Sequence, residues 1–208
     1  MIVKTRTSMI SLAAMISLAL LTGCIDLLPG GGPAAKLYSL TPKSSYDENL
    51  PKVDWQLVVE LPISAETLNT PRITLSRSPL TLDYYGGARW SERAPLMVQT
   101  LLVESFENSG RIVAVARKST DLRADYVLKT DLREFQAVYS GDGPPVIHVE
   151  LNAKLIKMPQ RTIIASFKSE RKIQAGGTEL IYIIQAFDQA LGKVLKGVVE
   201  WALVTPDS

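Results

Sequence analysis

Residues 147–155 of the chain read Ile-His-Val-Glu-Leu-Asn-Ala-Lys-Leu, and this stretch decides the fold. Apolar and polar residues alternate along it, which is the period of a strand with one buried and one solvated face. Turn-forming residues flank the stretch at 140–145 (Ser-Gly-Asp-Gly-Pro-Pro) and at 158–160 (Met-Pro-Gln). Similar alternation fills 125–139 before the first turn and resumes at 163–167 after the second. The pattern predicts a three-stranded antiparallel meander.

The first strand of this meander is long for a strand. If residues 125–139 were unbroken, they would span about 50 Å at 3.3 Å per residue, whereas most strands have about five or six residues. We therefore expect a bulge or a bend near Asp131 to Glu134.

Two segments have the period of a helix. Residues 94–109 carry a broad apolar stripe, and Gly110 stands where a C-terminal cap is expected. Residues 178–203 repeat apolar side chains every three or four positions over about 37 Å, which is long enough to cross a sheet. Gly192 and Gly197 are unfavourable inside a helix, so we expect them where this second helix packs closely against a neighbour.

Shorter apolar runs predict additional strands. We expect them at residues 36–40, 55–61, 73–76, 80–85 and 112–116. The pair Gly86-Gly87 is expected to end the fourth of these runs. The elements together predict an α+β fold, with a largely antiparallel sheet and two helices packed on one of its faces.

The first residues have the composition of an export signal. Lys4 and Arg6 precede an apolar run over residues 9–20, which is shorter than the about 20 residues of a membrane span. Leu21-Thr22-Gly23-Cys24 then places small residues before the only cysteine of the chain, as in the lipobox of bacterial lipoproteins. The alternative is an ordinary signal peptide with an incidental cysteine, but a lone thiol in a secreted protein would need its own explanation.

The lipobox divides the chain into three parts. We predict a signal peptide over residues 1–23 that is cleaved off, and an S-diacylglyceryl and an N-acyl chain on Cys24. Residues 24–35 then form an acylated, glycine- and proline-rich tether, and residues 36–208 form a single domain. Several acyl chains hold a protein stably on a membrane, whereas one chain does so only marginally.

The residue after the cysteine is informative about the membrane. It is Ile25, and the acidic residue comes only at Asp26, whereas an Asp directly after the cysteine favours the inner membrane. We therefore expect the outer membrane, with the domain facing the periplasm. Removal of the signal lowers the formal charge from +2 to about zero, and no basic run remains that would favour nucleic acid.

The residues offer little for catalysis. His148 is the only histidine, and its place in the alternation puts it on the solvated face of a strand. The sequence contains neither a Gly-x-Ser-x-Gly elbow nor a phosphate-binding Gly-x-x-x-x-Gly-Lys loop. We therefore expect no enzymatic activity, no metal site, and no cofactor other than the lipid on Cys24.

One aromatic segment stands out between a strand and a helix. Residues 82–92 read Leu-Asp-Tyr-Tyr-Gly-Gly-Ala-Arg-Trp-Ser-Glu. Tyr, Trp and Arg often anchor interfaces, so Tyr84, Tyr85, Arg89 and Trp90 are candidates for contact with a partner, on a strand that could be an exposed sheet edge. The alternative is a structural corner in which Trp90 fills the core.

The order of several short motifs resembles that of the ABC-type transport auxiliary lipoproteins, the family that includes paraquat-inducible protein C. The matching pieces are Leu21 to Cys24, Leu37-Tyr38-Ser39-Leu40, Tyr84 to Trp90, Asp125-Tyr126-Val127-Leu128, and Val198-Val199-Glu200-Trp201. The resemblance implies an outer-membrane partner for an ABC permease and a protein with a mammalian-cell-entry domain, which together move lipids between membranes. It implies no catalytic residues.

We thus expect a docking component of a lipid transport system, anchored in the outer membrane and able to form a homo-oligomer. Two alternatives stay open at this point. The domain could itself carry a lipid, which would require an apolar cavity between sheet and helices. It could also be an envelope assembly factor.

Overall fold

The structure is a computed structural model, and it describes residues 34–117 and 123–207. Cys24 and the predicted signal and tether up to residue 33 lie outside the described residues. The contacts divide the chain into Met1–Ala34 and Ala35–Ser208, and the account below concerns the second unit. Within the described ranges, no helix combines the length and the hydropathy that a membrane span requires.

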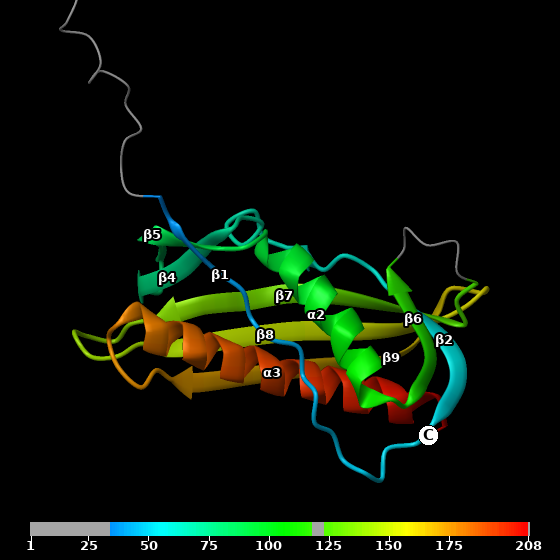
Figure 1. The fold of residues 1–208 in the computed structure, drawn as a ribbon. Coiled ribbons are helices and arrows are strands. Elements are labelled where there is room, and N and C mark those ends of the chain that lie inside the picture. Colours follow the sequence, from blue (N-terminus) through cyan, green and yellow to red (C-terminus); the bar gives the residue numbers. More distant parts are fainter. Residues whose placement is uncertain (1–33, 118–122, 208) are drawn as a thin grey trace, which may run out of the picture. The chain divides into compact units, whose positions relative to one another are not determined.

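The elements follow one another along the chain as strands interrupted by two helices. They are β1 (Lys36–Tyr38), β2 (Val53–Val59), β3 (Ile63–Ser64), β4 (Arg72–Ser78), β5 (Thr81–Trp90), α2 (Ala94–Ser109), β6 (Ile112–Arg117), β7 (Tyr126–Val138), β8 (Val146–Lys157), β9 (Thr162–Gln174), α3 (Leu180–Val204) and the short 3-10 helix η1 (Thr205–Asp207). The strands join in one nine-stranded sheet. In Figure 1, α2 and α3 both lie in front of the sheet, with α3 running along β8 and β9, so the predicted α+β arrangement is confirmed.

The predicted meander forms the largest part of the sheet. β8 pairs antiparallel with β7 on one side and with β9 on the other over its whole length. At its centre, Leu151 lies opposite Leu132 of β7 and Ser169 of β9, and all three are buried. Each of these strands therefore turns one face to the helices and the other face outward, as the alternation predicts.

A bulge interrupts β7 where the sequence predicts one. Leu132 pairs with Leu151 and Glu134 pairs with Glu150, so Arg133 is an extra residue without a partner of its own on β8. The extra residue reverses the alternation. Before it the even-numbered residues are buried, and after it Phe135 and Ala137 are.

The remaining strands join the sheet mainly through parallel pairs. The path through the sheet is β1-β5-β4-β7-β2-β6, with β3 also on β7 and β8 and β9 off the path. β4 and β5 form an antiparallel hairpin, whereas the pairs β1–β5, β4–β7, β2–β7 and β2–β6 are parallel. The long antiparallel pairs involve the most residues, and parallel pairs join the shorter strands to them.

Three aromatic rings hold the layers together. Trp90 of β5, Phe135 of β7 and Phe187 of α3 lie with ring centroids 5.1 to 5.5 Å apart, in edge and tilted geometry. Trp90 is 1 % exposed, and its indole nitrogen has no hydrogen-bond partner in the described part of the chain. Packing therefore holds the ring, and the space between sheet and helices is filled at this point.

The helices occupy nearly the predicted residues. α2 ends at Ser109, and Gly110 caps it with φ 61°, a left-handed conformation that suits glycine. In α3, a Cβ at Gly197 would lie 3.0 Å from Ser169 Oγ, so the glycine permits close packing on β9 as expected. The same expectation is wrong for Gly192, where a Cβ would meet nothing within 4 Å.

The prediction that Gly86-Gly87 ends a strand is also wrong. β5 continues through both glycines to Trp90. Gly87 has φ 68°, and the register with β4 shifts between the pairs Thr74–Tyr84 and Arg72–Arg89. The glycines therefore form an irregularity within the strand, which lets a ladder continue after extra residues.

Substitution of Phe187 by alanine tests the role of the aromatic cluster. Phe187 is fully buried, so Phe187→Ala should lower the free energy of unfolding by about 3–5 kcal/mol, as measured by urea denaturation. Leu80→Ala is the control, because Leu80 is 95 % exposed and its loss should change stability by less than about 0.5 kcal/mol. A loss below about 1 kcal/mol for Phe187→Ala would show that the cluster does not support the fold.

Candidate functional site

Tyr84 of the aromatic segment lies on the surface and supports an arginine. The guanidinium carbon of Arg72 is 3.6 Å from the centroid of the Tyr84 ring, within the range of a cation–π contact. The hydroxyl of Tyr84 donates a hydrogen bond of 3.1 Å to the carbonyl of Thr67. The ring is therefore fixed at both ends, and it holds the exposed Arg72 in place.

Arg89 lies beside this pair. It is directly opposite Arg72 in the β4–β5 ladder, and Leu37 of β1 lies opposite it on the other side. Arg89 is exposed, and Leu37 is 68 % exposed. We call Leu37, Arg72, Tyr84 and Arg89 the arginine patch. Like charges placed opposite each other in a sheet are unfavourable, so this patch favours an acidic partner.

Tyr85 and Trp90 point away from the patch. The hydroxyl oxygens of Tyr85 and Tyr139 are 2.8 Å apart, and the guanidinium carbon of Arg77 is 4.5 Å from the Tyr139 ring centroid. Burial, followed by the contact with Tyr139, raises the pKa of Tyr85 well above its usual value of 10.0. The prediction that Trp90 contacts a partner is wrong, because its side chain is buried in the core. The alternative, in which Trp90 fills the core at a structural corner, fits the structure.

The predicted sheet edge is open over part of β5. β1 covers only Ala88–Trp90, and the described residues place no strand beside the preceding half of β5 on that side. The structure thus brings Tyr84 and Arg89 together on one surface and separates them from Tyr85 and Trp90. Alternation along a strand explains the separation, since neighbouring residues face opposite sides.

The outer face of the meander carries a network of ion pairs. Glu170 Oε1 lies 2.8 Å from His148 Nε2, and Glu170 Oε2 lies 2.7 Å from Lys168 Nζ. Lys168 also lies 3.2 Å from Glu150, which in turn is 3.9 Å from Arg133. His148 is on the outer face as predicted, but its side chain is only 15 % exposed because these neighbours surround it.

The same residues are the candidates for holding a metal. Among the described residues, ligand atoms of His148, Glu150 and Glu170 lie within 4.8 Å of one another. Lys168 bridges both carboxylates, so an ion would have to displace a cation that is already in place. The arrangement is that of a structural ion network, and no nucleophile or general base stands free within it.

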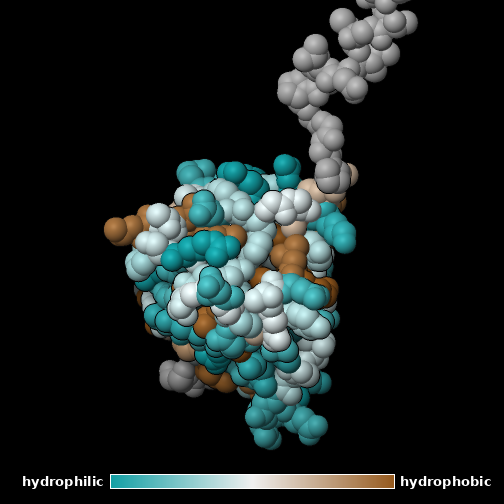
Figure 2. Space-filling view, turned by 90° about the vertical axis from the view of Figure 1, so that its left-hand side faces the viewer, coloured by the Kyte–Doolittle hydropathy of each residue, from teal (hydrophilic) through white to brown (hydrophobic). Residues whose placement is uncertain are grey.

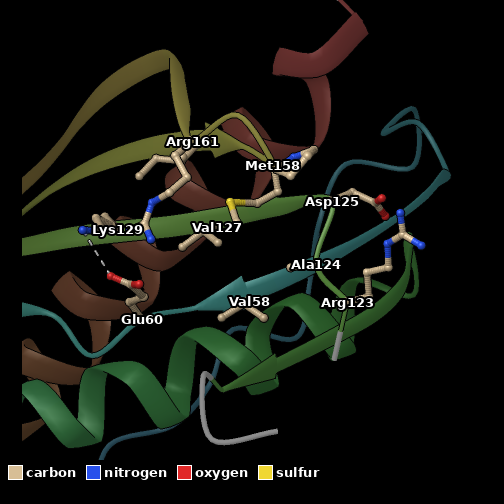
Figure 3. A pocket seen from close by; sticks show the side chains of 11 residues that line it. Val58, Glu60, Arg123, Ala124, Asp125, Val127, Lys129, Met158 and Arg161 are labelled. Carbon is tan, nitrogen blue, oxygen red and sulfur yellow. Dashed lines mark ion pairs between the residues drawn. The ribbon is translucent and has the colours of Figure 1, made fainter. Parts of the chain in front are cut away.

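A surface pocket lies at the other end of the outer face, where β7 begins and β8 ends. Its volume is about 400 Å³, and its floor is apolar, formed by Val58, Val127, Ile156 and Met158. Figure 3 shows Arg161 and Arg123 on opposite sides of Val58 and Val127. No hydrogen bond or ion pair of either guanidinium is found in the described residues, whereas Lys129 pairs with Glu60 at 3.5 Å. The pocket therefore suits an anionic group attached to an apolar one.

No local pattern in the sequence predicts this pocket. Its arginines come from separate loops, before β7 and between β8 and β9, and only the fold brings them together. A local signal exists at Arg161, which is the only described non-glycine residue with a positive φ, at 59°. A side chain in that conformation is strained, and strained residues are frequent at functional sites.

Comparison with known proteins identifies the class of protein. Over residues 38–199 the chain matches the ABC-type transport auxiliary lipoprotein component family. The chain belongs to this family, which confirms the resemblance of its motifs. The description of the family is that of a lipoprotein component auxiliary to ABC-type transport.

Individual relatives agree with this assignment. The crystal structure of protein XCC0632 from Xanthomonas campestris is 35 % identical, covers 83 % of this chain and 97 % of that chain, and superposes with a TM-score of 0.79. An uncharacterized protein at 13 % identity, covering 81 % of this chain and 99 % of that chain, shares the fold with a TM-score of 0.65.

One curated relative is a longer protein. The uncharacterized protein bll6063 of Bradyrhizobium diazoefficiens is 26 % identical over 189 residues, which are 89 % of this chain. The chain spans about half the length of that relative, at 50 %. The same domain thus occurs there joined to additional sequence.

The ion network should set the titration of Glu170. Its pKa is lowered from 4.5 to about 2 by the hydrogen bond from Lys168 and then by that from His148. A carboxyl with a lowered pKa in the folded state stabilises the fold above its unfolded pKa, and this contribution is lost as the pH falls from about 4.5 towards about 2. NMR titration of wild type should place the Glu170 midpoint near 2, and Lys168→Met should move it towards 4.5. Lys154→Met is the control on the same face. An unchanged midpoint in Lys168→Met would contradict the assigned cause.

Proposed function

We propose that the protein is a periplasmic lipoprotein anchored in the outer membrane, and that it serves as a non-catalytic docking component of an ABC transport system. In this proposal its direct partner is a mammalian-cell-entry-domain protein, through which the ABC permease moves lipids between the two membranes. The membership of residues 38–199 in the auxiliary lipoprotein family carries the proposal. The lipobox at Leu21 to Cys24 supports the anchor, and Ile25 after the cysteine supports the outer membrane.

The interior of the domain supports docking over lipid carriage. A carrier needs an apolar cavity for an acyl chain between the sheet and the helices. Phe135 and Phe187 meet there in direct ring contact, and both are at most 1 % exposed. The features that remain for function therefore lie on the surface.

The arginine patch is the surface that fits docking best. Arg72 and Arg89 are held opposite each other although their charges repel, and the Tyr84 ring fixes one of them. Leu37 adds an exposed apolar side chain beside Arg89. Such a surface matches a partner that presents carboxylates around an apolar residue, and arginine and tyrosine are frequent energetic centres of interfaces.

Capture of the mammalian-cell-entry-domain protein by the purified, acylated chain tests this proposal. The double variant Arg72→Glu/Arg89→Glu should weaken capture at least about tenfold, because two close charge contacts become repulsive. The matched control is Lys157→Glu, which reverses an exposed cation on β8 outside the patch. Circular dichroism should show both variants folded. Equal capture by wild type and the double variant would remove the patch from the proposal, and no capture by wild type would refute the docking role.

A second candidate function rests on the Arg123–Arg161 pocket. The guanidinium of Arg161 lies beside the apolar floor, whereas that of Arg123 lies beside Asp125 (Figure 3), so the pocket could bind one anionic amphiphile, such as a phospholipid with its phosphate on Arg161. The strained backbone of Arg161 favours this reading, since glycine or asparagine would suit a positive φ better. In that case the domain would hold a lipid at its surface and not in its core.

Native mass spectrometry tests whether the Arg123–Arg161 pocket binds a phospholipid. If the pocket binds lipid, the wild-type chain should retain one phospholipid, and Arg161→Gly should lose most of it, because the guanidinium is removed without straining the turn. Arg171→Gly removes an exposed arginine from β9 and is the control. Equal retention in wild type and Arg161→Gly would exclude this site.

A further inference from the structure

The direction in which the chain enters the domain follows from the topology. β1 is parallel to β5, with Lys36 opposite Ala88 and Tyr38 opposite Trp90. β1 therefore enters the sheet from the direction of the turn that joins β4 to β5. By sequence, eleven residues separate β1 from Cys24, the predicted point of acylation.

Several turns meet at this same end of the domain. β7 ends at Val138, β8 begins at Val146, β9 ends at Gln174 and α3 begins at Leu180. β4 runs parallel to β7, with Ser76 beside Val138, so the β4–β5 turn extends past the end of β7. Figure 2 views this end, on which apolar groups protrude from a mostly hydrophilic surface.

The apolar residue that protrudes most is in the β4–β5 turn. Leu80 is 95 % exposed and follows Pro79, and Leu82 at the start of β5 is 44 % exposed. The turn is held by hydrogen bonds from Ser76 Oγ and Thr81 Oγ1 to the carbonyl of Ser78, at 2.8 and 3.5 Å. Leu80 is thus directed into the solvent, and burial within the described residues gives no reason for an apolar side chain at this position. At the same end, Ile181 and Tyr182 of α3 are 48 % and 43 % exposed.

Charged residues surround the turn, and they limit how deeply Leu80 could enter an apolar phase. Arg77 precedes the turn, and its guanidinium carbon lies 4.5 Å from the centroid of the Tyr139 ring. The acidic residues Asp83, Asp142 and Glu179 are exposed on the same end. A bilayer interface accommodates this combination, because a protruding leucine can enter the acyl boundary while charged groups stay among the headgroups.

We propose that the β4–β5 turn inserts Leu80 into the interface of the bilayer that holds the lipid anchor, and so orients the domain on its membrane. This inference rests on the proposed function, because it requires an acylated Cys24. By sequence, the eleven residues 25–35 separate the anchor from β1, and even a fully extended chain of that length spans at most about 40 Å, so an anchored domain stays close to the bilayer surface. The anchor gives the turn a high effective concentration at the membrane, so a weak contact suffices.

Orientation follows from the position of the turn. Leu80 is at the end of the domain where β7 stops, and the Arg123–Arg161 pocket is where β7 starts. With Leu80 in the interface, the pocket points away from the bilayer. The pair Arg72 and Arg89 of the arginine patch is at the far end of β5 from the turn and stays accessible to a partner.

Site-specific labelling of the full acylated chain tests the insertion. Because Cys24 is the only cysteine and carries lipid, Leu80→Cys provides a single free thiol for an environment-sensitive nitrobenzoxadiazole label. The protein is reconstituted into vesicles of phosphatidylethanolamine and phosphatidylglycerol. The label at position 80 should shift its emission to shorter wavelength, lose most of its quenching by aqueous iodide and gain quenching by nitroxide-labelled lipid.

Val113→Cys is the control, since Val113 is 66 % exposed on β6 and should keep its label in water. An iodide-accessible label at position 80 would overturn the proposal, and so would a lipid-accessible label at both positions.

Two further measurements test the lipid anchor independently of the insertion. Wild type should take up no label, and Cys24→Ser should leave the membrane fraction. Labelling of wild type would show that the anchor fails, whereas an unlabelled wild type with a water-exposed position 80 would show that only the insertion fails.

Discussion

The contact of Trp90, Phe135 and Phe187 depends on one extra residue in β7. Without the bulge at Arg133, the alternation of β7 would continue and direct Glu134 to the core and Phe135 to the solvent. The bulge reverses the alternation, so that Phe135 meets Trp90 from the β4–β5 hairpin and Phe187 from α3. Three elements that are distant in sequence are joined at this point. The burial of their rings also fills the space between sheet and helices at this point.

Because the interior is filled where the three rings meet, the two faces of the sheet have different roles. Helices α2 and α3 seal one face of the sheet, and ion pairs among His148, Glu170 and Lys168 order the other face. The surfaces of the domain differ in charge and hydropathy, which are the properties that select partners. This is the physical basis on which an auxiliary lipoprotein can act by position and contact.

Local periodicity explains what the sequence could predict. The meander, the bulge near Arg133 and the two helices follow from patterns that need no distant contact. The parallel pairs of β2 and β4 with β7 have no local pattern, because any short apolar run can pair in either direction. The outer-membrane location and the acylated Cys24 stay predictions.

The candidate site was predictable only in part. The aromatic segment identified Tyr84 and Arg89, but the buried position of Trp90 depends on which side of β5 faces the helices, and the glycines obscured that. Arg72 was not identified, since its role comes from its register with Arg89. Arg123 and Arg161 are 38 residues apart in the sequence and line the same pocket through the fold alone.

The central place of β7 has a consequence for how the chain folds. Its partner β2 is distant in sequence, for Leu57 pairs with Tyr126, which lies 69 residues further along the chain. Loops of this length must close before the pairing stabilises anything, and folds dominated by such contacts form slowly. A polypeptide that crosses a membrane before folding benefits from that delay. If the predicted signal at residues 1–23 exports this chain, slow closure of the sheet would keep it unfolded during the crossing.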